Sequence, residues 1–513
     1  MEALSTKRAA GALVFVGFMG AGKSSAARAV AAELGVDPID CDAELERELG
    51  TPIEEFFDRE GEPAFREREE EAALRLLGSG EARVLALGGG ALGSERVRAA
   101  LAPHTVVHLE IEPAEAWRRA SGKGRPLARD RDRLESLHAE RLAVYEEVAD
   151  ATLPADFPRA GAGRAAPALA ALGEAPERTR LVWASAESGD YPVFLGRGLI
   201  AEGFFFPGDG RRFVVTDEHV ARHHAIDAQH RVSVLAGEEH KTIHGAELVL
   251  RELAAAGARR GDLVVALGGG VVGDLAGFCA AVYQRGIRHV QAPTTLVAQV
   301  DSAYGGKTGV DLPEGKNYVG AFHQPAAVLC DPATLETLPR EELAAGYPEV
   351  VKTALIAGGA LWEQVRSGAE VDESIILGCL RTKLAVVAAD ERDAGRRQVL
   401  NLGHTVGHAI EAATGYTRYR HGEAVGVGLL CALRLSGRDE LRREVAELLS
   451  AQDLPLTFSG APLADVLAAL QRDKKRTGEQ VPFALVAEPG EVTPGHEPPE
   501  AEVRAAVEEV HAG

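Results

Sequence analysis

The apolar residues in the first third of the chain occur in short runs separated by longer amphipathic stretches. The runs have the length and branched composition of buried strands, and the stretches between them have helical spacing. Strands that alternate with helices predict a parallel α/β sheet. A glycine- and proline-containing stretch then interrupts the pattern, so we expect a domain of residues 1–173 and a linker at 174–180. The expected strands are 12–16, 84–87 and 105–109, and the clearest helical spacing is at 24–34 and 160–172.

A second α/β pattern begins at Leu181, where short apolar runs again alternate with amphipathic stretches. After Pro339 the apolar spacing becomes mostly helical as far as about Leu470. We therefore expect an α/β part at 181–338 and a helical part at 339–513. The expected strands of the α/β part are 213–216, 231–235 and 263–267.

Length and charge narrow the class of protein. A chain of 513 residues is too long for one core, so several domains are expected. Its formal net charge of −21 argues against binding to nucleic acid or to an anionic membrane, because both would repel it. Five scattered cysteines without a CxxC pair favour neither a disulfide framework nor a thiolate zinc site, and they fit a reducing cytoplasm.

The basic residues carry a sharper signal, because the chain contains 46 arginines and only ten lysines. A retained lysine marks a position where a compact ammonium group does something that a guanidinium cannot. Lys7, Lys123 and Lys383 lie outside any motif. The other seven lie in the motifs described below: Lys23, Lys241, Lys307, Lys316, Lys352, Lys474 and Lys475.

The first motif, at residues 17–24, matches GxxxxGK[ST], follows an expected strand and opens an expected helix. Its backbone N–H groups can enclose phosphates, its lysine can reach the β- and γ-phosphates, and its serine hydroxyl can bind Mg²⁺. The motif predicts ATP or GTP binding. The nucleotide contacts are expected at Gly20, Ala21, Gly22, Lys23, Ser24 and Ser25.

Five further features follow this loop in order, and each alone has a structural explanation such as helix capping or surface charge. They are Asp40 with Asp42, the FRE segment containing Arg66, the glycines 88–90, an RPL segment at Arg125, and Arg141. Together with the loop they resemble the shikimate kinase family over residues 11–173.

The resemblance implies transfer of the ATP γ-phosphoryl group to shikimate. Asp42 would bind the substrate hydroxyls, and Arg66 and Arg141 would hold its carboxylate. Asp40 would support Mg²⁺, and Arg125 would lie near the phosphates. Gly88 and Gly89 would approach the substrate ring.

A second glycine run, at 268–274, follows an expected strand and is by itself weak evidence for dinucleotide binding. Farther along the chain, His404 and His408 lie one helical turn apart, with His421 close behind. Their spacing alone nominates a zinc triad, although purely structural histidines remain an alternative. Thr405 stands where HExxH would require glutamate, which disfavours a metalloprotease.

Residues 181–488 resemble the 3-dehydroquinate synthase family. The segments that carry the resemblance are GEEHKT (237–242), GGGVVGDLAGFCAA (268–281), RGIRHVQAPTTLVAQVDSAYGGKTGVDL (285–312), GKNYVGAFHQP (315–325), PEVVKTALI (348–356), NLGHTVGHAIE (401–411), HGEAVGVG (421–428) and DKK (473–475).

The resemblance changes the expected metal ligands to Glu349, His404 and His421, and places His408 in the substrate pocket. It implies conversion of DAHP, a seven-carbon sugar acid phosphate, to 3-dehydroquinate and phosphate. NAD⁺ would oxidise a hydroxyl, phosphate would be eliminated, and the hydride would be returned before an aldol closure. A mixed carboxylate and imidazole site suits a Lewis-acid zinc.

The resemblance also assigns the remaining site residues. Cofactor contacts are expected at Asp217, Glu238, Lys241, Gly270, Val271, Asp274, Thr294, Thr295, Lys307, Lys316 and Thr337. Substrate contacts are expected at Arg285, Asn317, Asn401, Lys474 and Lys475. Across both halves, catalytic roles are expected for Lys23, Asp42, Arg125, Asp301, Lys307, Lys352, Arg397 and His408. His219, Ala236, Tyr304 and Pro348 depart from the family pattern.

These inferences combine into one expectation of fold and function. We expect a P-loop NTPase-type parallel-sheet domain, then a dehydroquinate-synthase-like α/β NAD-binding part with a helical metal-binding part. The expected enzyme is bifunctional, uses ATP with Mg²⁺, and binds NAD⁺ with Zn²⁺ or Co²⁺. We expect a cytoplasmic homodimer, formed through the synthase half, that binds small molecules.

Three alternatives to this expectation remain open. In the first, the second half is a sugar-phosphate cyclase that acts on another substrate. In the second, it is a metal- and NAD-dependent alcohol dehydrogenase. In the third, the whole chain is a nucleotide-sensing regulator in which one half keeps an inactive, relic site.

Overall fold

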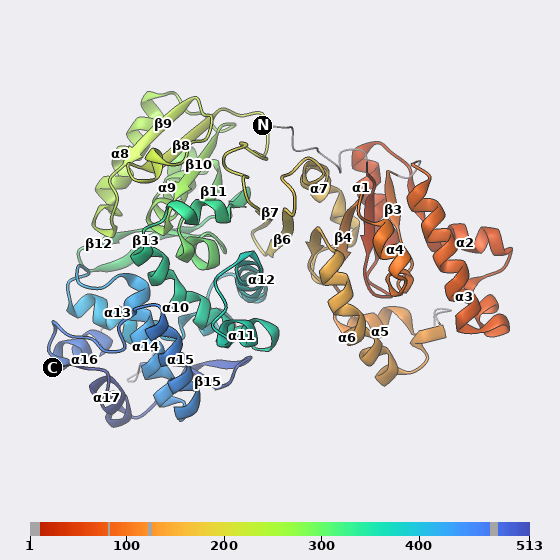
Figure 1. The fold of residues 1–513 in the computed structure, drawn as a ribbon. Helices are drawn as coiled ribbons and strands as arrows, with labels where there is room; N and C mark the ends of the chain where they lie inside the picture. The colour runs from red at the N-terminus through yellow and green to blue at the C-terminus, as the bar shows by residue number, and fades with distance from the viewer. Residues whose placement is uncertain (1–10, 81–82, 122–125, 472–480, 513) are drawn as a thin grey trace. The chain divides into compact units, whose positions relative to one another are not determined.

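The computed structural model describes residues 11–80, 83–121, 126–471 and 481–512 (Figure 1). Within these residues, no helix combines the length and hydropathy that crossing a bilayer requires. All five cysteines are buried and free. The chain forms two compact units, which are Met1–Ser185 with Pro192–Arg197, and Ala186–Tyr191 with Gly198–Gly513.

The first unit is built on a parallel sheet whose strands follow the order β2, β3, β1, β4, β5. Strands β1, β3, β4 and β5 are buried along their whole length, as expected for a parallel sheet covered on both faces. β6 continues the sheet in parallel beside β5. The strands are β1 (Leu13–Val16), β2 (Pro38–Asp40), β3 (Val84–Ala86), β4 (Thr105–Leu109), β5 (Ala151–Leu153), β6 (Arg180–Ala186) and, shared between the units, β7 (Gly189–Leu195).

After β1, the chain forms β2 and β3 on one side of that strand, and it then crosses over to form β4 on the other side. The carboxyl edge of β1 is therefore a topological switch point, the place where open α/β sheets bind ligands. The helices of this unit are α1 (Lys23–Leu34), α2 (Cys41–Leu49), α3 (Ile53–Gly78), α4 (Glu95–Ala100), α5 (Pro113–Ala120), α6 (Arg131–Val148) and α7 (Ala166–Leu172), with the 3-10 helix η3 (Arg159–Ala165) before α7.

The second unit begins with a further set of parallel strands, which pair in the order β14, β11, β10, β8, β9. Helices α8 (Ile243–Ala255) and α9 (Gly270–Val282) bury apolar side chains against it. The antiparallel pair β12 (Lys307–Leu312) and β13 (Gly315–Phe322) lies against α9. The sheet strands are β8 (Arg212–Asp217), β9 (His230–Val234), β10 (Leu263–Gly268), β11 (Arg288–Pro293) and β14 (Ala327–Cys330).

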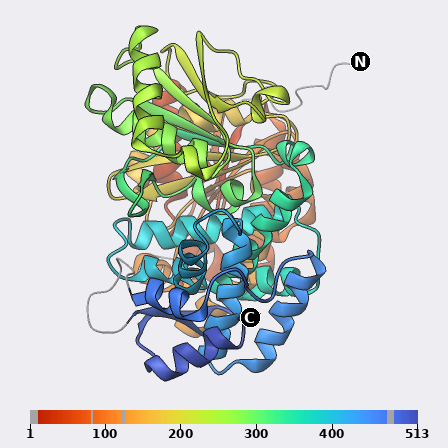
Figure 2. The same cartoon turned by 90° about the vertical axis from the view of Figure 1, so that its left-hand side faces the viewer.

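The rest of the second unit is mainly helical, with one small hairpin. Figure 2 shows the sheet of this unit in green at one end and the later helices in blue at the other. The α/β class predicted for both halves is confirmed, as is the helical character after Pro339. The helices are α10 (Arg340–Ala357), α11 (Gly359–Arg366), α12 (Glu373–Ala389), α13 (His404–Ala413), α14 (His421–Leu435), α15 (Asp439–Ala451), α16 (Leu463–Gln471) and α17 (Glu500–Glu508), and the hairpin is β15 (Phe483–Glu488) with β16 (Glu491–His496).

Candidate active sites

The glycine motif of the first unit forms the loop between β1 and α1. Gly20 and Gly22 have φ angles of 81° and 84°, left-handed values that other residues rarely adopt. Gly22 is the N-cap of α1, and the N–H groups at a helix N-terminus attract phosphate. The Lys23 ammonium donates to the carbonyls of Gly17 (3.0 Å) and Phe18 (3.3 Å). A positive charge is thereby fixed at the phosphate-binding end of the helix.

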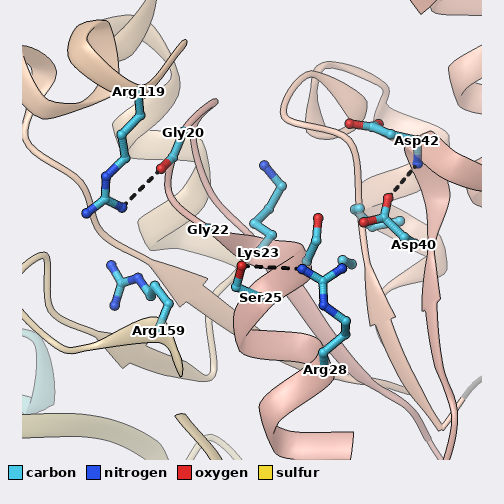
Figure 3. Close-up of a pocket in the computed structure, with 12 residues that line it drawn as sticks. Gly20, Gly22, Lys23, Ser25, Arg28, Asp40, Asp42, Arg119 and Arg159 are labelled. Atoms are coloured by element: carbon cyan, nitrogen blue, oxygen red, sulfur yellow. Dashed lines mark hydrogen bonds between the residues drawn. The ribbon is translucent and has the colours of Figure 1, made fainter. Parts of the chain in front are cut away.

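A pocket of about 500 Å³ opens beside this loop (Figure 3). In the view of Figure 3, Arg119 and Arg159 lie on one side of Lys23, and Asp40 and Asp42 lie on the other. The Asp40 carboxylate accepts the N–H of Asp42 at 3.1 Å, so it caps α2 as well as lining the pocket. Ala21 is fully buried in the loop. Asp42, the residue expected to bind the substrate hydroxyls, also lines the pocket. The expected nucleotide and metal residues that line it are Gly20, Gly22, Lys23, Ser24, Ser25 and Asp40.

The expected shikimate residues gather around the glycine run after β3. Arg141 and the Tyr145 hydroxyl both donate to the Gly89 carbonyl, at 2.8 Å and 2.6 Å. A Cβ atom on Gly88 would lie 2.9 Å from a carboxylate oxygen of Asp42, and one on Gly89 would lie 3.6 Å from the Lys23 ammonium. Because Gly88 and Gly89 have no side chains, the backbone of this run can lie close to both Asp42 and Lys23.

Arg66 lies beside the same glycine run and is held by two carboxylates, Glu69 at 2.5 Å and Glu62 at 3.2 Å. Burial raises the pKa of Glu69, although the Arg66 charge opposes that shift. Arg125, the last expected kinase residue, lies outside the described residues.

Arg159 is a pocket residue that the sequence patterns missed, because one arginine among 46 has no distinguishing context. Its buried guanidinium donates to the carbonyls of Ala21 (2.9 Å), Pro154 (2.9 Å) and Glu110 (2.5 Å). Desolvation lowers its pKa to about 10, so it stays charged at neutral pH. The side chain joins the nucleotide loop to the ends of β4 and β5.

We expect Arg159→Met to raise the KM for ATP about tenfold. The substitution removes the donors that hold the Ala21 carbonyl, and a hydrogen bond of this kind is worth roughly 1.5 kcal/mol or more. Steady-state kinase assays measure the change. Arg164→Met is the matched control, because Arg164 lies on the same 3-10 helix but stacks on Phe157 outside the pocket. An unchanged KM in the Arg159 variant would contradict the assigned role.

The second unit contains a larger cavity, of about 1430 Å³, lined by both its α/β part and its helical part. Thr337 does not line it, because its hydroxyl donates to the Thr334 carbonyl (3.0 Å) and contacts His224 (2.7 Å). The expected cofactor residues that do line it are Asp217, Glu238, Lys241, Gly270, Val271, Asp274, Thr294, Thr295, Lys307 and Lys316.

The glycine run after β10 forms one wall of this cavity, and α9 begins within it at Gly270. A Cβ atom on Gly269 would lie 2.8 Å from the Thr295 methyl group, and one on Gly270 would lie 3.0 Å from the Ser302 hydroxyl. The absent side chains allow close contact between the loop and these hydroxyl-bearing residues. The N-terminus of α9 therefore opens into the cavity, which suits a pyrophosphate.

Most of the residues expected to bind substrate or to act in catalysis in this unit border the same cavity. Lys352 is almost completely buried and contacts the cavity-lining Asp301 at 3.0 Å. Arg285, on the short helix η6 (Tyr283–Arg285), does not line the cavity. Lys474 and Lys475 lie outside the described residues. The expected substrate and catalytic residues that line the cavity are Asp301, Lys307, Asn317, Arg397, Asn401 and His408.

The expected metal ligands converge from three helices, α10, α13 and α14. One carboxylate oxygen of Glu349, Oε1, lies 3.3 Å from His404 Nε2 and 3.4 Å from His421 Nε2. Glu349 is completely buried, which raises its pKa, but Lys352 and His404 outweigh that effect and hold the pKa well below its usual range. A buried, ionised carboxylate facing two imidazoles is a donor set that fits a divalent metal.

Histidine spacing alone had nominated His404, His408 and His421. Each of these three does offer a ring nitrogen within 4.8 Å of the others. Asp301, Glu349 and His404 form a second group that meets the same criterion. The two groups share His404, so the donors surround one region of the cavity.

Lys383, which the sequence patterns left without a role, lies in this cavity on α12. Its ammonium donates to the backbone carbonyl of Asp301 (2.7 Å) and contacts the Asp301 carboxylate. Burial raises the pKa of Asp301, but Lys352 and Lys383 reverse the shift and bring it to about 2. Two buried lysines thus keep Asp301 ionised beside the metal ligands.

We expect Lys383→Met to lower the turnover of the second unit roughly 100-fold, a typical loss for one preorganised polar group. The substitution leaves Asp301 with a single lysine and frees its orientation. The rate of the kinase half, measured on the same sample, reports whether the chain remains folded. A wild-type turnover in the variant would show that the lysine only fills space.

Comparisons with known proteins agree with this division of the chain. A sequence model of shikimate kinase matches residues 19–160. Models of the N-terminal and C-terminal parts of 3-dehydroquinate synthase match residues 231–345 and 346–476. The 3-dehydroquinate synthase of Halorhodospira halophila is 42% identical over 355 residues, covering 64% of this chain and 100% of that protein. The enzyme of the same name from Symbiobacterium thermophilum is 44% identical over 334 residues, covering 59% and 92%.

Two solved structures share the fold of the second half. A 2-deoxy-scyllo-inosose synthase complexed with carbaglucose-6-phosphate, NAD⁺ and Co²⁺ has a TM-score of 0.57 at 24% identity, covering 64% of this chain and 100% of that one. A 2-epi-5-epi-valiolone synthase from Streptomyces hygroscopicus, with NAD⁺ and Zn²⁺ bound, has a TM-score of 0.57 at 23% identity, covering 64% and 98%. With these relatives and the two pockets established, the chain belongs to the 3-dehydroquinate synthase family and carries a shikimate kinase domain ahead of its synthase part.

Proposed function

We propose that the second unit converts DAHP to 3-dehydroquinate and phosphate, using NAD⁺ and a divalent metal, Zn²⁺ or Co²⁺. The observation that carries this proposal is that His404 and His421 line the cavity that the α9 glycine run also borders, and that the buried Glu349 carboxylate faces both imidazoles. A hydride acceptor and a Lewis acid would then meet the same substrate. When bound, NAD⁺ supplies reversible hydride transfer, and the metal supplies polarisation of a substrate oxygen.

The residues of the chain would do the remaining work. Three of the cations that line the cavity, Lys307, Lys316 and Arg397, would hold the phosphate and carboxylate of the substrate. Asp301, kept ionised by its two lysines, would accept a hydrogen bond from a substrate hydroxyl.

We further propose that the first unit transfers the γ-phosphoryl group of ATP, with Mg²⁺, to shikimate. Lys23 and the α1 N-terminus would neutralise the phosphates. Asp42 would orient the attacking hydroxyl, and Arg66 and Arg141 would hold the carboxylate beside the glycine run. Asp40 and Ser24 line the same pocket and would support the metal.

Separate assays on the purified full chain test both proposals. We expect phosphate release from DAHP that requires NAD⁺ and stops with a chelator, and ADP formation that requires shikimate. Because the hydride is returned, NADH should not accumulate. Net NADH accumulation would identify a dehydrogenase instead, and turnover of a different sugar phosphate with DAHP inert would identify another cyclase.

We also propose that the enzyme works in the cytoplasm as a homodimer formed through its synthase half. Five buried free cysteines are consistent with a reducing compartment. Sedimentation of the full chain at several concentrations tests the assembly, and a monomer at the highest concentration would contradict it.

A further inference from the structure

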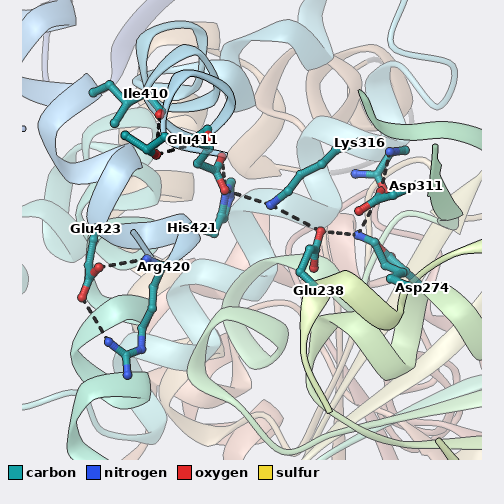
Figure 4. A network of polar contacts seen from close by, with 12 residues as sticks. Glu238, Asp274, Asp311, Lys316, Ile410, Glu411, Arg420, His421 and Glu423 are labelled. Carbon is teal, nitrogen blue, oxygen red and sulfur yellow. Dashed lines mark hydrogen bonds and ion pairs between the residues drawn. The ribbon is translucent and has the colours of Figure 1, made fainter. Parts of the chain in front are cut away.

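A line of alternating charges crosses the synthase cavity (Figure 4). It begins at the expected metal ligand His421, whose Nδ1 lies 3.3 Å from Glu411 Oε2. The other oxygen of Glu411 accepts from the Lys316 ammonium at 2.9 Å. Lys316 lies 3.4 Å from Glu238, which lies 2.9 Å from Lys241. The line therefore joins a residue of the metal site to residues expected to contact the dinucleotide.

Lys241, at the end of this line where the dinucleotide is expected, is held in place by several carboxylates. Lys241 is 4% exposed and also contacts Asp274 (3.3 Å) and Asp311 (3.8 Å). Burial alone would lower the pKa of Lys241, but the carboxylates of Asp274, Glu238 and Asp311 outweigh that effect and hold the pKa above its usual value, so the ammonium stays charged. Asp274 lies on α9, the helix whose N-terminus opens into the cavity. A dinucleotide bound there would meet Lys241 and Asp274 directly.

Glu411 is placed to act on the metal site. It lies seven residues after His404 on α13, two helical turns along the same face. Its side chain is 2% exposed, and its two oxygens are committed to different partners. A carboxylate that accepts from one ring nitrogen of a histidine fixes the ring so that the other nitrogen faces the metal. Here the other nitrogen, Nε2 of His421, faces Glu349 at 3.4 Å.

Lys316 is the point where the line passes between the two parts of this unit. It lies on β13 of the α/β part, whereas Glu411 lies in the helical part that supplies the metal ligands. Its ammonium also lies 5.0 Å from the centre of the Tyr416 ring, and with two carboxylates beside it the group has a defined position. Because the Lys316 ammonium contacts the Glu411 carboxylate, a ligand that fixes the position of Lys316 also restricts the position of Glu411.

We propose that Glu411 and Lys316 couple metal binding to dinucleotide binding, with Glu411 as a positioning residue for His421. This inference rests on the proposed use of NAD⁺ and a divalent metal. A bound dinucleotide would order Lys241 and Glu238, these would fix Lys316, and Lys316 would hold Glu411 against His421. By linkage, each ligand then tightens the binding of the other by the same factor.

The experiment titrates Co²⁺ into the metal-free full chain, with and without saturating NAD⁺, and follows the visible absorbance of the bound ion. The coupling factor is the ratio of the two dissociation constants, so it does not depend on the intrinsic affinity for NAD⁺. We expect NAD⁺ to tighten Co²⁺ binding at least about fivefold in the wild type, the lower end of the range usual for coupled sites.

The variants separate the two roles. Glu411→Gln should weaken Co²⁺ binding roughly 10- to 100-fold, as loss of a ligand-orienting partner does, and should bring the coupling factor to about 1. Lys316→Met should also abolish the coupling while leaving Glu411 in place. Asp262→Asn is the control, because this buried carboxylate pairs with Arg211 outside the cavity, and its coupling factor should equal that of the wild type.

The possible outcomes are distinct. Failure of the wild type to bind Co²⁺ or NAD⁺ would overturn the proposed function. Binding of both with a factor of 1 in the wild type would overturn the coupling alone, as would a wild-type factor in Lys316→Met. If Glu411→Gln is poorly folded, as judged by its kinase rate and thermal unfolding, the Lys316 variant still decides the question.

Discussion

Replacement of Lys23 by alanine is expected to lower the kinase turnover of the full chain roughly 1000-fold, while the release of phosphate from DAHP continues at the wild-type rate. The ammonium is held by two loop carbonyls and lies next to Gly89, where the phosphoryl group would be transferred. Removal of one preorganised charge-stabilising group costs about 4 kcal/mol in the transition state at the upper end of measured cases. A coupled assay for ADP, run with and without shikimate, measures the loss.

Lys23→Arg is the informative companion to this variant. The planar guanidinium does not replace a compact ammonium between the carbonyls of Gly17 and Phe18, so we expect it to rescue little activity. The synthase rate of the same sample reports on folding. Kinase activity within a fewfold of wild type in the alanine variant would refute the assigned role of the lysine.

The second large effect is expected for His404→Ala. This substitution removes one of the two imidazoles that face Glu349 and leaves that buried carboxylate with less compensation. Loss of a residue that only orients a metal ligand lowers metal affinity by up to roughly 100-fold, and loss of a ligand itself should lower it further. The rate of phosphate release from DAHP should fall together with the metal affinity. Metal content after gel filtration and phosphate release at fixed free Zn²⁺ measure the two effects.

His224→Ala is the matched control, because this histidine belongs to the same unit but contacts Thr337 outside the cavity. Its metal content and turnover should match the wild type. Full metal occupancy and turnover in His404→Ala would remove His404 from the ligand set and leave the other histidines as candidates.

The fold was largely predictable because the central strands of both units are short apolar runs bounded by turns. The runs expected at 84–87, 105–109 and 263–267 are β3, β4 and β10, to within one residue. Such strands are buried on both faces, so their hydrophobicity is continuous and easy to see. The π-helix at Ala298–Ser302, which presents Asp301, has no comparable signal, because its backbone follows from packing with distant segments.

The candidate sites were predictable only in part, and for a physical reason. The glycine motif is contiguous, so its geometry is local. Glu349 lies 55 positions before His404, and histidine spacing alone could not bring it to the metal site. Lys383 reaches Asp301 only through the packing of α12. Glu411 did have a local signal, since it continues the helical face of His404 and His408.

The contact between Arg159 and the nucleotide loop has a consequence for how the chain matures. The two partners are 138 residues apart, and the side chain that braces the Ala21 carbonyl is supplied near the end of the first unit. During synthesis, the loop emerges from the ribosome long before its brace does. A nascent chain that stops short of Arg159 should therefore expose the whole glycine motif and yet bind ATP poorly, and nucleotide binding should appear only once this segment has been translated and folded.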